Sequence, residues 1–252
     1  MRRIALLCLA LPLLLSSPAL ADNWAVFPPG SPWNGVLAGA WPYVSQAHVA
    51  QCDGAGCVQI ATATGYQVMA TWSTPAGPVT LPTAVTANHV LCVPGAAPAQ
   101  QIQLLGRTLA VPSGLCGNPY VYAPPGADTA AWPVGGVSGG LPLAPLAWPS
   151  PGDQLLVTGY PMGSPAADLV TVQASDVPGS ELEPDGTSLP LPGVIIVTGP
   201  IYEGNSGSPA LDSQGRVVGT VVAGGGQSGW TPDGRATWDG IHALIVPWWE
   251  GY

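Results

Sequence analysis

Lysine is absent from this sequence, and five arginines are its only strongly basic residues. Charged residues make up 8% of the chain, and the formal net charge is −9. A strongly acidic protein is repelled by nucleic acid and by anionic membranes, so neither is an expected partner. Apolar residues nevertheless amount to 47%, which is typical of a folded, turn-rich domain and not of a disordered chain.

The first 21 residues have the pattern of a signal peptide. Arg2 and Arg3 provide a positive start, residues 4–15 form an apolar run, and Ala19 and Ala21 are the small residues of a cleavage site. At about 12 residues, this run is too short for a membrane-spanning helix, so no transmembrane anchor is expected. Cleavage near Ala21 leaves a net charge of 3 − 14 = −11, and we expect a secreted or periplasmic protein.

The cysteines beyond the signal peptide predict disulfides. Four remain, an even number that suits an oxidising compartment. Three connectivities are possible, and proximity in the chain favours Cys52 with Cys57 and Cys92 with Cys116. A metal site built from His48, Cys52 and Cys57 is the rival interpretation, but a fourth ligand is not evident. We therefore expect no metal and no cofactor.

The apolar segments are short, rich in β-branched residues and separated by turn residues, which predicts an all-β fold. No convincing amphipathic helix is present, apart from a short turn near Trp248. Residues 135–152 combine glycine and proline without a strand pattern and are interpreted as a connector between two halves. The predicted strands cover residues 58–64, 67–72, 84–88, 101–105, 108–111, 154–159, 169–174, 194–198, 216–223 and 241–246.

The stretch Gly-Asn-Ser-Gly-Ser-Pro at residues 204–209 places Ser206 inside a glycine-flanked turn. Glycine permits a tight backbone whose amides point inward, and such a backbone binds anions. A serine nucleophile also needs a base and a third group that orients the base. The three histidines and a few aspartates are the candidates for these roles.

His89 is the candidate base, because it stands at the end of an apolar strand, where a side chain is held rigidly. Neutral imidazole is the usual general base near pH 7. Asp128 is the candidate orienting group, since it directly precedes a small apolar segment, and a buried carboxylate needs a partner. Asp153 competes, but it follows Pro151 and Gly152 and has the pattern of a turn residue.

The order His89, Asp128, Ser206 resembles that of the trypsin-like serine proteases with the chymotrypsin fold, especially bacterial secreted and periplasmic members. The resemblance implies two antiparallel β-barrels with the active site between them, the first at residues 58–140 and the second at 141–252. Residues 22–57 are left as an N-terminal segment of uncertain role. The resemblance extends over residues 58–246 through five segments: Val-Thr-Ala-Asn-His ending at His89, Asp128 with its strand, Gly152-Asp153 leading to Gly159-Tyr160-Pro161, the motif at 204–209, and the strand at 216–219.

The resemblance implies a monomeric serine endopeptidase that acts on proteins or peptides. Its oxyanion hole would be formed by the amides of Gly204 and Ser206. Its substrate pocket would involve Pro200, Val221 and Val222, which carry no charge and favour a small or apolar residue before the scissile bond. Three departures from the family pattern are Ser208, in place of a commoner glycine, Cys92, which lies three residues after His89 instead of adjacent to it, and Asn205, which argues against activation by insertion of a new N-terminus.

Three alternatives remain. An α/β-hydrolase esterase would use Ser206, then Asp233 or Asp239, then His242, but it requires glycine in place of Ser208 and helices between the strands. A protease-fold protein without turnover and a tryptophan-rich carbohydrate-binding module are the non-enzyme alternatives. The ten tryptophans could provide stacking platforms for sugars.

Overall fold

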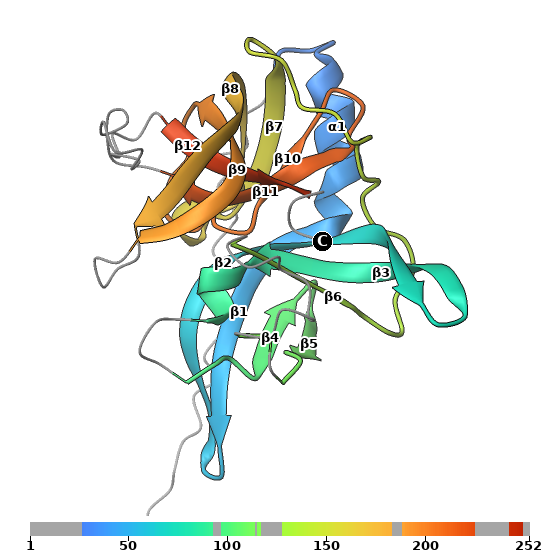
Figure 1. Cartoon of the computed structure of the whole chain (residues 1–252), viewed down its shortest axis with the longest axis vertical. Coiled ribbons are helices and arrows are strands. Elements are labelled where there is room, and N and C mark those ends of the chain that lie inside the picture. The colour runs from blue at the N-terminus through green and yellow to red at the C-terminus, as the bar shows by residue number, and fades with distance from the viewer. Residues whose placement is uncertain are drawn as a thin grey trace, which may run out of the picture.

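The structure is a computed structural model of the 252-residue chain, and it describes residues 27–92, 97–113, 115–116, 128–182, 188–224 and 242–248. Most of these residues lie in antiparallel strands that form two units, one below the other in Figure 1. The all-β prediction is confirmed, and the α/β-hydrolase alternative is wrong because no strand of either unit is followed by a covering helix as that fold requires, throughout the described ranges. The predicted signal peptide, Asp233 and Asp239 lie outside the described residues.

The lower unit is a six-stranded sheet with the strand order β5-β4-β1-β2-β3-β6. All neighbouring strands in it are antiparallel. One face packs on a core that includes Val49, Ile102 and Trp132. The strands are β1 (Val44–Asp53), β2 (Gly56–Thr74), β3 (Gly77–Ala87), β4 (Gln101–Leu104), β5 (Arg107–Ala110) and β6 (Thr129–Pro133).

The upper unit is a closed barrel in which the strands pair in the order β10-β11-β12-β9-β8-β7, and β7 pairs back with β10. Closure leaves no free strand edge, and the interior is filled by side chains such as Val157, Ile195 and Ile245. The strands are β7 (Gln154–Gly159), β8 (Ala166–Leu182), β9 (Ser188–Thr198), β10 (Pro209–Leu211), β11 (Val217–Gly224) and β12 (His242–Pro247).

A third apolar cluster lies between the two units and joins them. It includes Tyr66 and Val68 from β2 together with Leu156 from β7 and Val217 from β11. The predicted connector, residues 135–152, contains no strand and crosses this region. Within it Leu141 forms an isolated parallel bridge to Val68, and residue 143 forms another to Val217. The connector is therefore bonded to one strand of each unit.

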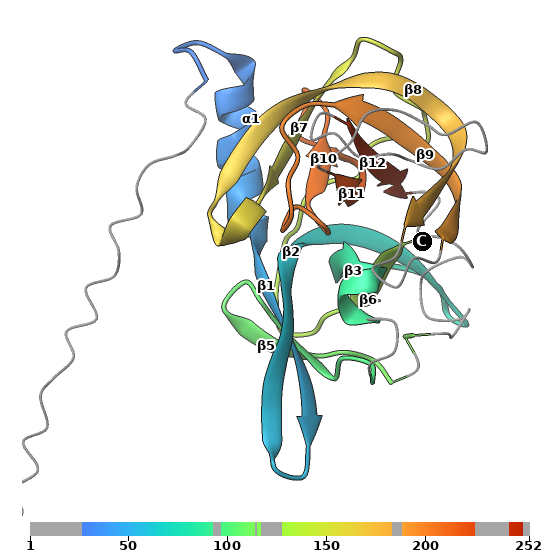
Figure 2. The same ribbon diagram turned by 90° about the vertical axis from the view of Figure 1, so that its left-hand side faces the viewer.

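The helix α1 (Pro32–Ala40) was not expected from the sequence. Its start signal is local: the Ser31 side chain accepts a hydrogen bond from the amide of Trp33, and proline occupies the first helical position. Gly35 and Gly39 weaken the helical pattern. Trp33 and Ala40 instead anchor the helix in the cluster between the units, beside β7 (Figure 2). Among the described helices, none is long and apolar enough to cross a membrane.

The first sheet also differs in extent from the sequence-based expectation. Residues 58–64 and 67–72, predicted as two strands, belong to the single 19-residue strand β2. Strand β1 pairs with β2 from Val44 to Asp53, so the sheet begins before residue 58, inside the segment whose role was left open. Strand β1 shows no clear alternation of buried and exposed residues, because it is largely half-buried and is interrupted by a bulge after Val49.

Two disulfides are formed, Cys52–Cys57 and Cys92–Cys116, the pairings that proximity in the chain favours. The first joins directly opposed residues of the β1–β2 hairpin, which projects from the body in Figures 1 and 2. The thiols of the alternative metal site are therefore used in a disulfide.

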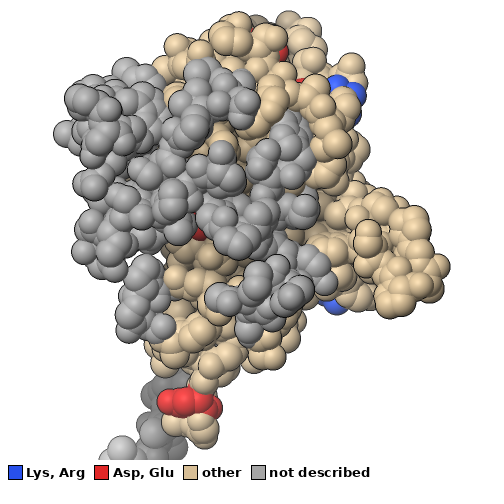
Figure 3. Space-filling view, in the orientation of Figure 1, with Lys and Arg blue, Asp and Glu red and all other residues tan. Residues whose placement is uncertain are grey.

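Acidic atoms appear at the tip of this hairpin in Figure 3, whereas the described surface in that view is otherwise almost uncharged.

Candidate active site

His89 and Asp128 are brought together by the backbone at one end of the first sheet. Strand β3 ends at Ala87 and passes directly into the single-turn helix α2 (Asn88–Leu91), which carries His89. Asp128 stands immediately before β6, the neighbour of β3. The amide of Asn88 donates to the carbonyl of Asp128 at 3.0 Å, which continues the pairing of β3 with β6 by one more bond. Sequence positions 39 residues apart thus become neighbours.

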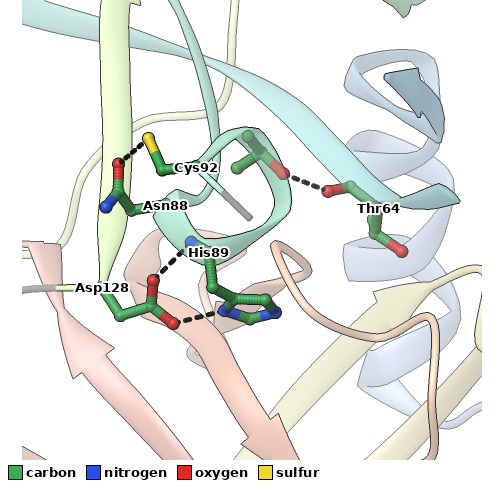
Figure 4. A network of polar contacts seen from close by, with 6 residues as sticks. Thr64, Asn88, His89, Cys92 and Asp128 are labelled. Atoms are coloured by element: carbon green, nitrogen blue, oxygen red, sulfur yellow. Dashed lines mark hydrogen bonds and ion pairs between the residues drawn. The ribbon is translucent and has the colours of Figure 1, made fainter. Parts of the chain in front are cut away.

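The Asp128 carboxylate binds His89 through both of its oxygens. Oδ2 lies 2.5 Å from Nδ1 of the imidazole, and Oδ1 accepts the backbone amide of His89 at 2.7 Å (Figure 4). Asp128 is fully buried, whereas the His89 side chain is 23% exposed. Because a buried carboxylate is an acceptor, the ring donates from Nδ1, and Nε2 on the opposite side is left as an acceptor.

Ser206 follows a type II β-turn formed by residues 202–205. The amide of Asn205 donates to the carbonyl of Tyr202 at 3.0 Å, and Gly204 in the third position has φ +94°. A type II turn needs positive φ at this position only, which explains the glycine. A side chain on Gly204 would also meet the carbonyl of Tyr160 at 2.5 Å.

Three backbone amides of this loop are hydrogen-bonded and two are not. Those of Asn205, Gly207 and Ser208 donate to backbone carbonyls. Those of Gly204 and Ser206 have no acceptor in the described part of the chain. The carbonyl of Glu203 accepts the amide of Met162 at 2.8 Å, and in a trans peptide the Gly204 N–H must then point the opposite way. Two amides without an acceptor thus lie beside a partly exposed serine.

The serine loop is packed directly against the strand end that carries His89. The carbonyl of Ser206 accepts the amide of Thr64 on β2 at 3.0 Å. A Cβ on Gly207 would lie 2.1 Å from the carbonyl oxygen of Thr64 and 3.0 Å from the amide nitrogen of Ala87, so only glycine fits. Ala87 is two residues before His89. The Ser206 loop therefore lies against the end of the strand that leads to His89, although the two belong to different units.

Ser208 and Asn205, which both depart from the family pattern, are bonded to each other. The Ser208 hydroxyl donates to the side-chain oxygen of Asn205 at 3.2 Å, and both residues are buried. Gly159 provides the space for them, because a Cβ there would lie 2.0 Å from the Ser208 hydroxyl. Tyr160, the next residue, stacks at a tilt on Trp41, and burial raises the pKa of its phenol. A neutral polar contact thus stands where insertion of an N-terminus would need a carboxylate.

The three predicted pocket residues differ in burial. Pro200 is exposed to solvent. Val221 belongs to the barrel core, and Val222 is also fully buried. Adjacent strand residues normally face opposite sides, but a bulge between Val221 and Ala223 breaks that alternation. Residues 225–241, which follow these valines, lie outside the described ranges.

Sequence reasoning missed Thr64 as part of this site. It is fully buried on β2, and four hydrogen bonds connect it to the serine loop, to Tyr160 and to β3. No local signal distinguishes it from Thr62, two residues earlier, because both stand in a threonine-alanine strand pattern.

Among the described residues, no group of three or more histidine, cysteine, aspartate or glutamate side chains could hold a metal ion.

A family model described as a trypsin-like peptidase domain matches residues 63–219 of this chain. The match covers most of the first sheet and the barrel as far as β11, including His89, Asp128 and Ser206. No curated protein matches the sequence.

Solved structures of serine proteases have a similar fold. The active form of the Rv3671c protease from M. tuberculosis is 19% identical, with 89% of this chain and 84% of that chain covered and a TM-score of 0.55. Its inactive form gives the same identity and TM-score, with 89% and 92% covered. The HtrA-type protease AlgW with a tripeptide is 17% identical, with 85% of this chain and 59% of that chain covered and a TM-score of 0.52. At these identities the likeness concerns the fold.

Proposed function

Because the chain belongs to the trypsin-like peptidase family and is a serine endopeptidase, we propose that it cleaves peptide bonds with a His89–Asp128–Ser206 triad. Ser206 attacks the carbonyl carbon of the scissile bond and forms an acyl-enzyme. His89 accepts the serine proton and then returns it to the leaving amine. Water, activated by the same imidazole, hydrolyses the ester and frees Ser206.

The bonds of Asp128 suit His89 to this role. A carboxylate that accepts from Nδ1 holds the tautomer whose Nε2 lone pair can take a proton. The second bond, from the His89 amide to Oδ1, fixes the carboxylate relative to the helix that carries the ring. When the imidazole becomes a cation, the buried negative charge stabilises it. Asp128 thus orients the base and compensates its charge without exchanging a proton.

The free amides of Gly204 and Ser206 support the second part of the proposal. In the tetrahedral intermediate the carbonyl oxygen becomes an oxyanion, which these two donors would bind. Each such donor contributes roughly 3 to 4 kcal/mol to the stability of a comparable transition state. The single observation that carries the proposed function is the close approach of Gly207 to the first sheet, because a Cβ on it would meet the carbonyl of Thr64 and the amide of Ala87, two residues before His89.

We also propose an uncharged, small or apolar residue before the scissile bond. Pro200, Val221 and Val222 have no charge with which to pair arginine or lysine, and Glu203 is exposed to solvent. Export to a secreted or periplasmic location fits the two disulfides and the N-terminal pattern of residues 1–21. A peptide library with each residue type at this position measures the preference, and selective cleavage after arginine or lysine would contradict it.

The triad is tested with a fluorophosphonate probe, which labels activated serines. The wild-type protein should be labelled and should cleave peptides, and Ser206→Ala should lose both properties while keeping its melting temperature. Ser213→Ala is the matched control, since Ser213 lies in the turn between β10 and β11, away from His89. Unchanged labelling of Ser206→Ala would exclude it as the nucleophile. Sugar binding by a wild-type protein that cleaves no peptide would favour the carbohydrate-binding alternative.

A further inference from the structure

Thr64 is a buried residue of the first sheet that contacts the serine loop of the barrel with both its backbone and its side chain. It has no exposed surface. Its hydroxyl lies 2.8 Å from the carbonyl oxygen of Gly204, 140 positions later in the chain. Figure 4 shows Thr64 on the strand next to the His89 helix. One side chain of the histidine-bearing sheet therefore reaches the glycine whose amide faces the predicted oxyanion site.

The direction of each bond at this hydroxyl is fixed by its partners. The amide of Tyr160 can only donate, and it donates to the Thr64 hydroxyl at 2.9 Å. The carbonyl of Gly204 can only accept, so the single hydroxyl proton is directed to it. The hydroxyl thus connects two segments of the barrel, the one that begins at Tyr160 and the serine loop, and satisfies a polar group on each.

The Thr64 backbone completes the connection. Its amide donates to the carbonyl of Ser206 at 3.0 Å, and its own carbonyl accepts the Thr86 hydroxyl at 2.8 Å. Gly204 and Ser206 are the two residues whose amides are free. Thr64 therefore binds the carbonyl of each residue that offers an oxyanion donor.

Gly204 needs this support more than another residue would. Glycine has the widest choice of backbone conformations, so its peptide planes are held only by their bonds to neighbours. The plane before Gly204, which carries its amide, is held by the Met162 amide. The plane after it is held by the Thr64 hydroxyl and by the bond from the Asn205 amide to the Tyr202 carbonyl. A preorganised donor is effective because its orientation costs nothing at the moment of reaction. Loss of the hydroxyl would leave the second plane with one of its two bonds and reduce that preorganisation.

We infer that Thr64 is a positioning residue, whose side-chain hydroxyl keeps the Gly204 and Ser206 amides aimed at the developing oxyanion. The inference rests on the proposed function and deepens it. It assigns part of the oxyanion geometry to the first sheet, although both donor amides belong to the barrel loop.

The test compares Thr64→Val, which removes the hydroxyl at nearly constant shape, with Thr64→Ser, which retains it. Thr83→Val is the matched control, because Thr83 is equally buried, accepts from Trp72, donates to Leu81 and lies farther along β3 from the loop. The readouts are kcat and KM on peptide p-nitroanilides ending in Ala, Val or Leu. Melting temperature and the inhibition constant of a peptide aldehyde, whose adduct with a serine carries an oxyanion, complete the set.

Thr64→Val should lower kcat about 10- to 100-fold with KM within about threefold, since the full loss of one oxyanion donor costs 10²- to 10³-fold. Aldehyde affinity should fall by the same factor as kcat/KM, while the corresponding peptide alcohol, which forms no adduct, should bind as before. Thr64→Ser should restore kcat to within about threefold. Thr83→Val should lose as much thermal stability as Thr64→Val and keep its kcat.

Three results separate the possible failures. If Ser206→Ala abolishes hydrolysis but Thr64→Val retains wild-type kcat and aldehyde affinity, the inference about Thr64 is overturned and the triad stands. An equal fall of kcat in Thr64→Val and Thr83→Val would overturn it too, because the effect would then follow stability alone. If Ser206→Ala remains active, the proposed function itself fails.

Discussion

The histidine and serine sides of the active site are built in opposite ways. On the first sheet, the functional groups are side chains, and His89 and Asp128 hold each other through two bonds within that sheet. On the barrel, the proposed oxyanion donors are backbone amides in a glycine-rich loop. That loop is bonded within the barrel, to Met162 and Val221, and also to the first sheet, through Thr64 and the close approach of Gly207 to Ala87. The histidine side is thus self-contained, whereas the loop of the proposed oxyanion donors depends on contacts with both units.

This difference predicts how each side responds to damage. Changes at His89 or Asp128 should remove activity without loosening the interface between the units. Changes where the serine loop meets the first sheet should affect activity and stability together, because the same contacts position the loop and join the units. The four predictions below run from the largest expected effect to the smallest.

Asp128→Asn should lower kcat by about 10⁴-fold, the loss typical of a triad with the wrong histidine tautomer. His89 presents two donors to Asp128, its amide and Nδ1–H, but asparagine has one oxygen with which to accept them. The amide group of asparagine would instead donate to Nδ1, and the proton would move to Nε2. Asp212→Asn is the matched control, because Asp212 also accepts backbone amides and a cationic side chain, that of Arg216. Its kcat should stay at the wild-type value, and a similar loss in both variants would contradict the tautomer argument.

Gly207→Ala should disrupt the contact between the serine loop and the first sheet. Its Cβ would lie 2.1 Å from the Thr64 carbonyl oxygen and 2.4 Å from the Thr86 hydroxyl oxygen, at φ +85°. We expect a loss of about 3 kcal/mol in the free energy of unfolding and of about 10²-fold in kcat/KM, measured by urea denaturation and peptide hydrolysis.

Gly215→Ala is the control that separates the effect of a steric clash at Gly207 from the effect of an alanine at positive φ. Gly215 also has positive φ, +75°, but the nearest atom to its Cβ would be at an ordinary 3.8 Å. It should cost about 1 kcal/mol and leave kcat/KM unchanged. If Gly207→Ala kept full activity in its folded fraction, the barrel loop would not depend on the first sheet.

The two disulfides should differ in their effect on the histidine side. Cys92 is the C-cap of α2, three residues from His89, and its bond to Cys116 spans 24 positions. Replacing both by serine should cost about 3 kcal/mol and lower kcat/KM several-fold. The same replacement at Cys52 and Cys57 should cost about 2 kcal/mol or less, since this bond spans five positions in a hairpin already paired along its length. It should leave kcat/KM unchanged, and equal kinetic losses in both variants would contradict this difference.

The smallest effect concerns Asp168, a half-buried carboxylate on β8 without a hydrogen-bond partner in the described portion of the chain. Burial raises its pKa. Its folded pKa therefore exceeds the unfolded value, and its stabilising contribution is present below the unfolded pKa and lost as pH rises through the folded one. The Asp168→Asn side chain stays neutral at every pH, so the variant should not lose this stability. The melting temperature of the variant should exceed that of the wild type at pH 7 and match it at pH 3. A variant less stable at pH 7 would contradict this expectation, because it would show that the ionised carboxylate is stabilised by its surroundings.

Elements with a clear residue pattern over a few neighbouring positions could be predicted from the sequence, and elements without such a pattern could not. Strand β7 has the bounds predicted for it, because a turn precedes it and an apolar run, Leu155 to Val157, forms its centre. Strand β10 was missed because three residues are too few to show alternation, and α1 because two glycines interrupt its pattern. The bulge between Val221 and Ala223 could not be predicted either, because it leaves no mark in the residue types.

The sequence by itself determined the chemical groups: a serine between glycines, a histidine at a strand end, an aspartate before an apolar segment, and cysteines close enough to pair. Each of these depends on residues within a few positions, where local sterics and polarity decide the outcome. Only the tertiary structure decided that the Asp128 carboxylate meets His89 through both oxygens and that a threonine of the first sheet holds the serine loop. The first contact joins positions 39 residues apart and is settled by the pairing of β3 with β6. The second joins positions 140 residues apart and is settled by the packing of the two units against each other.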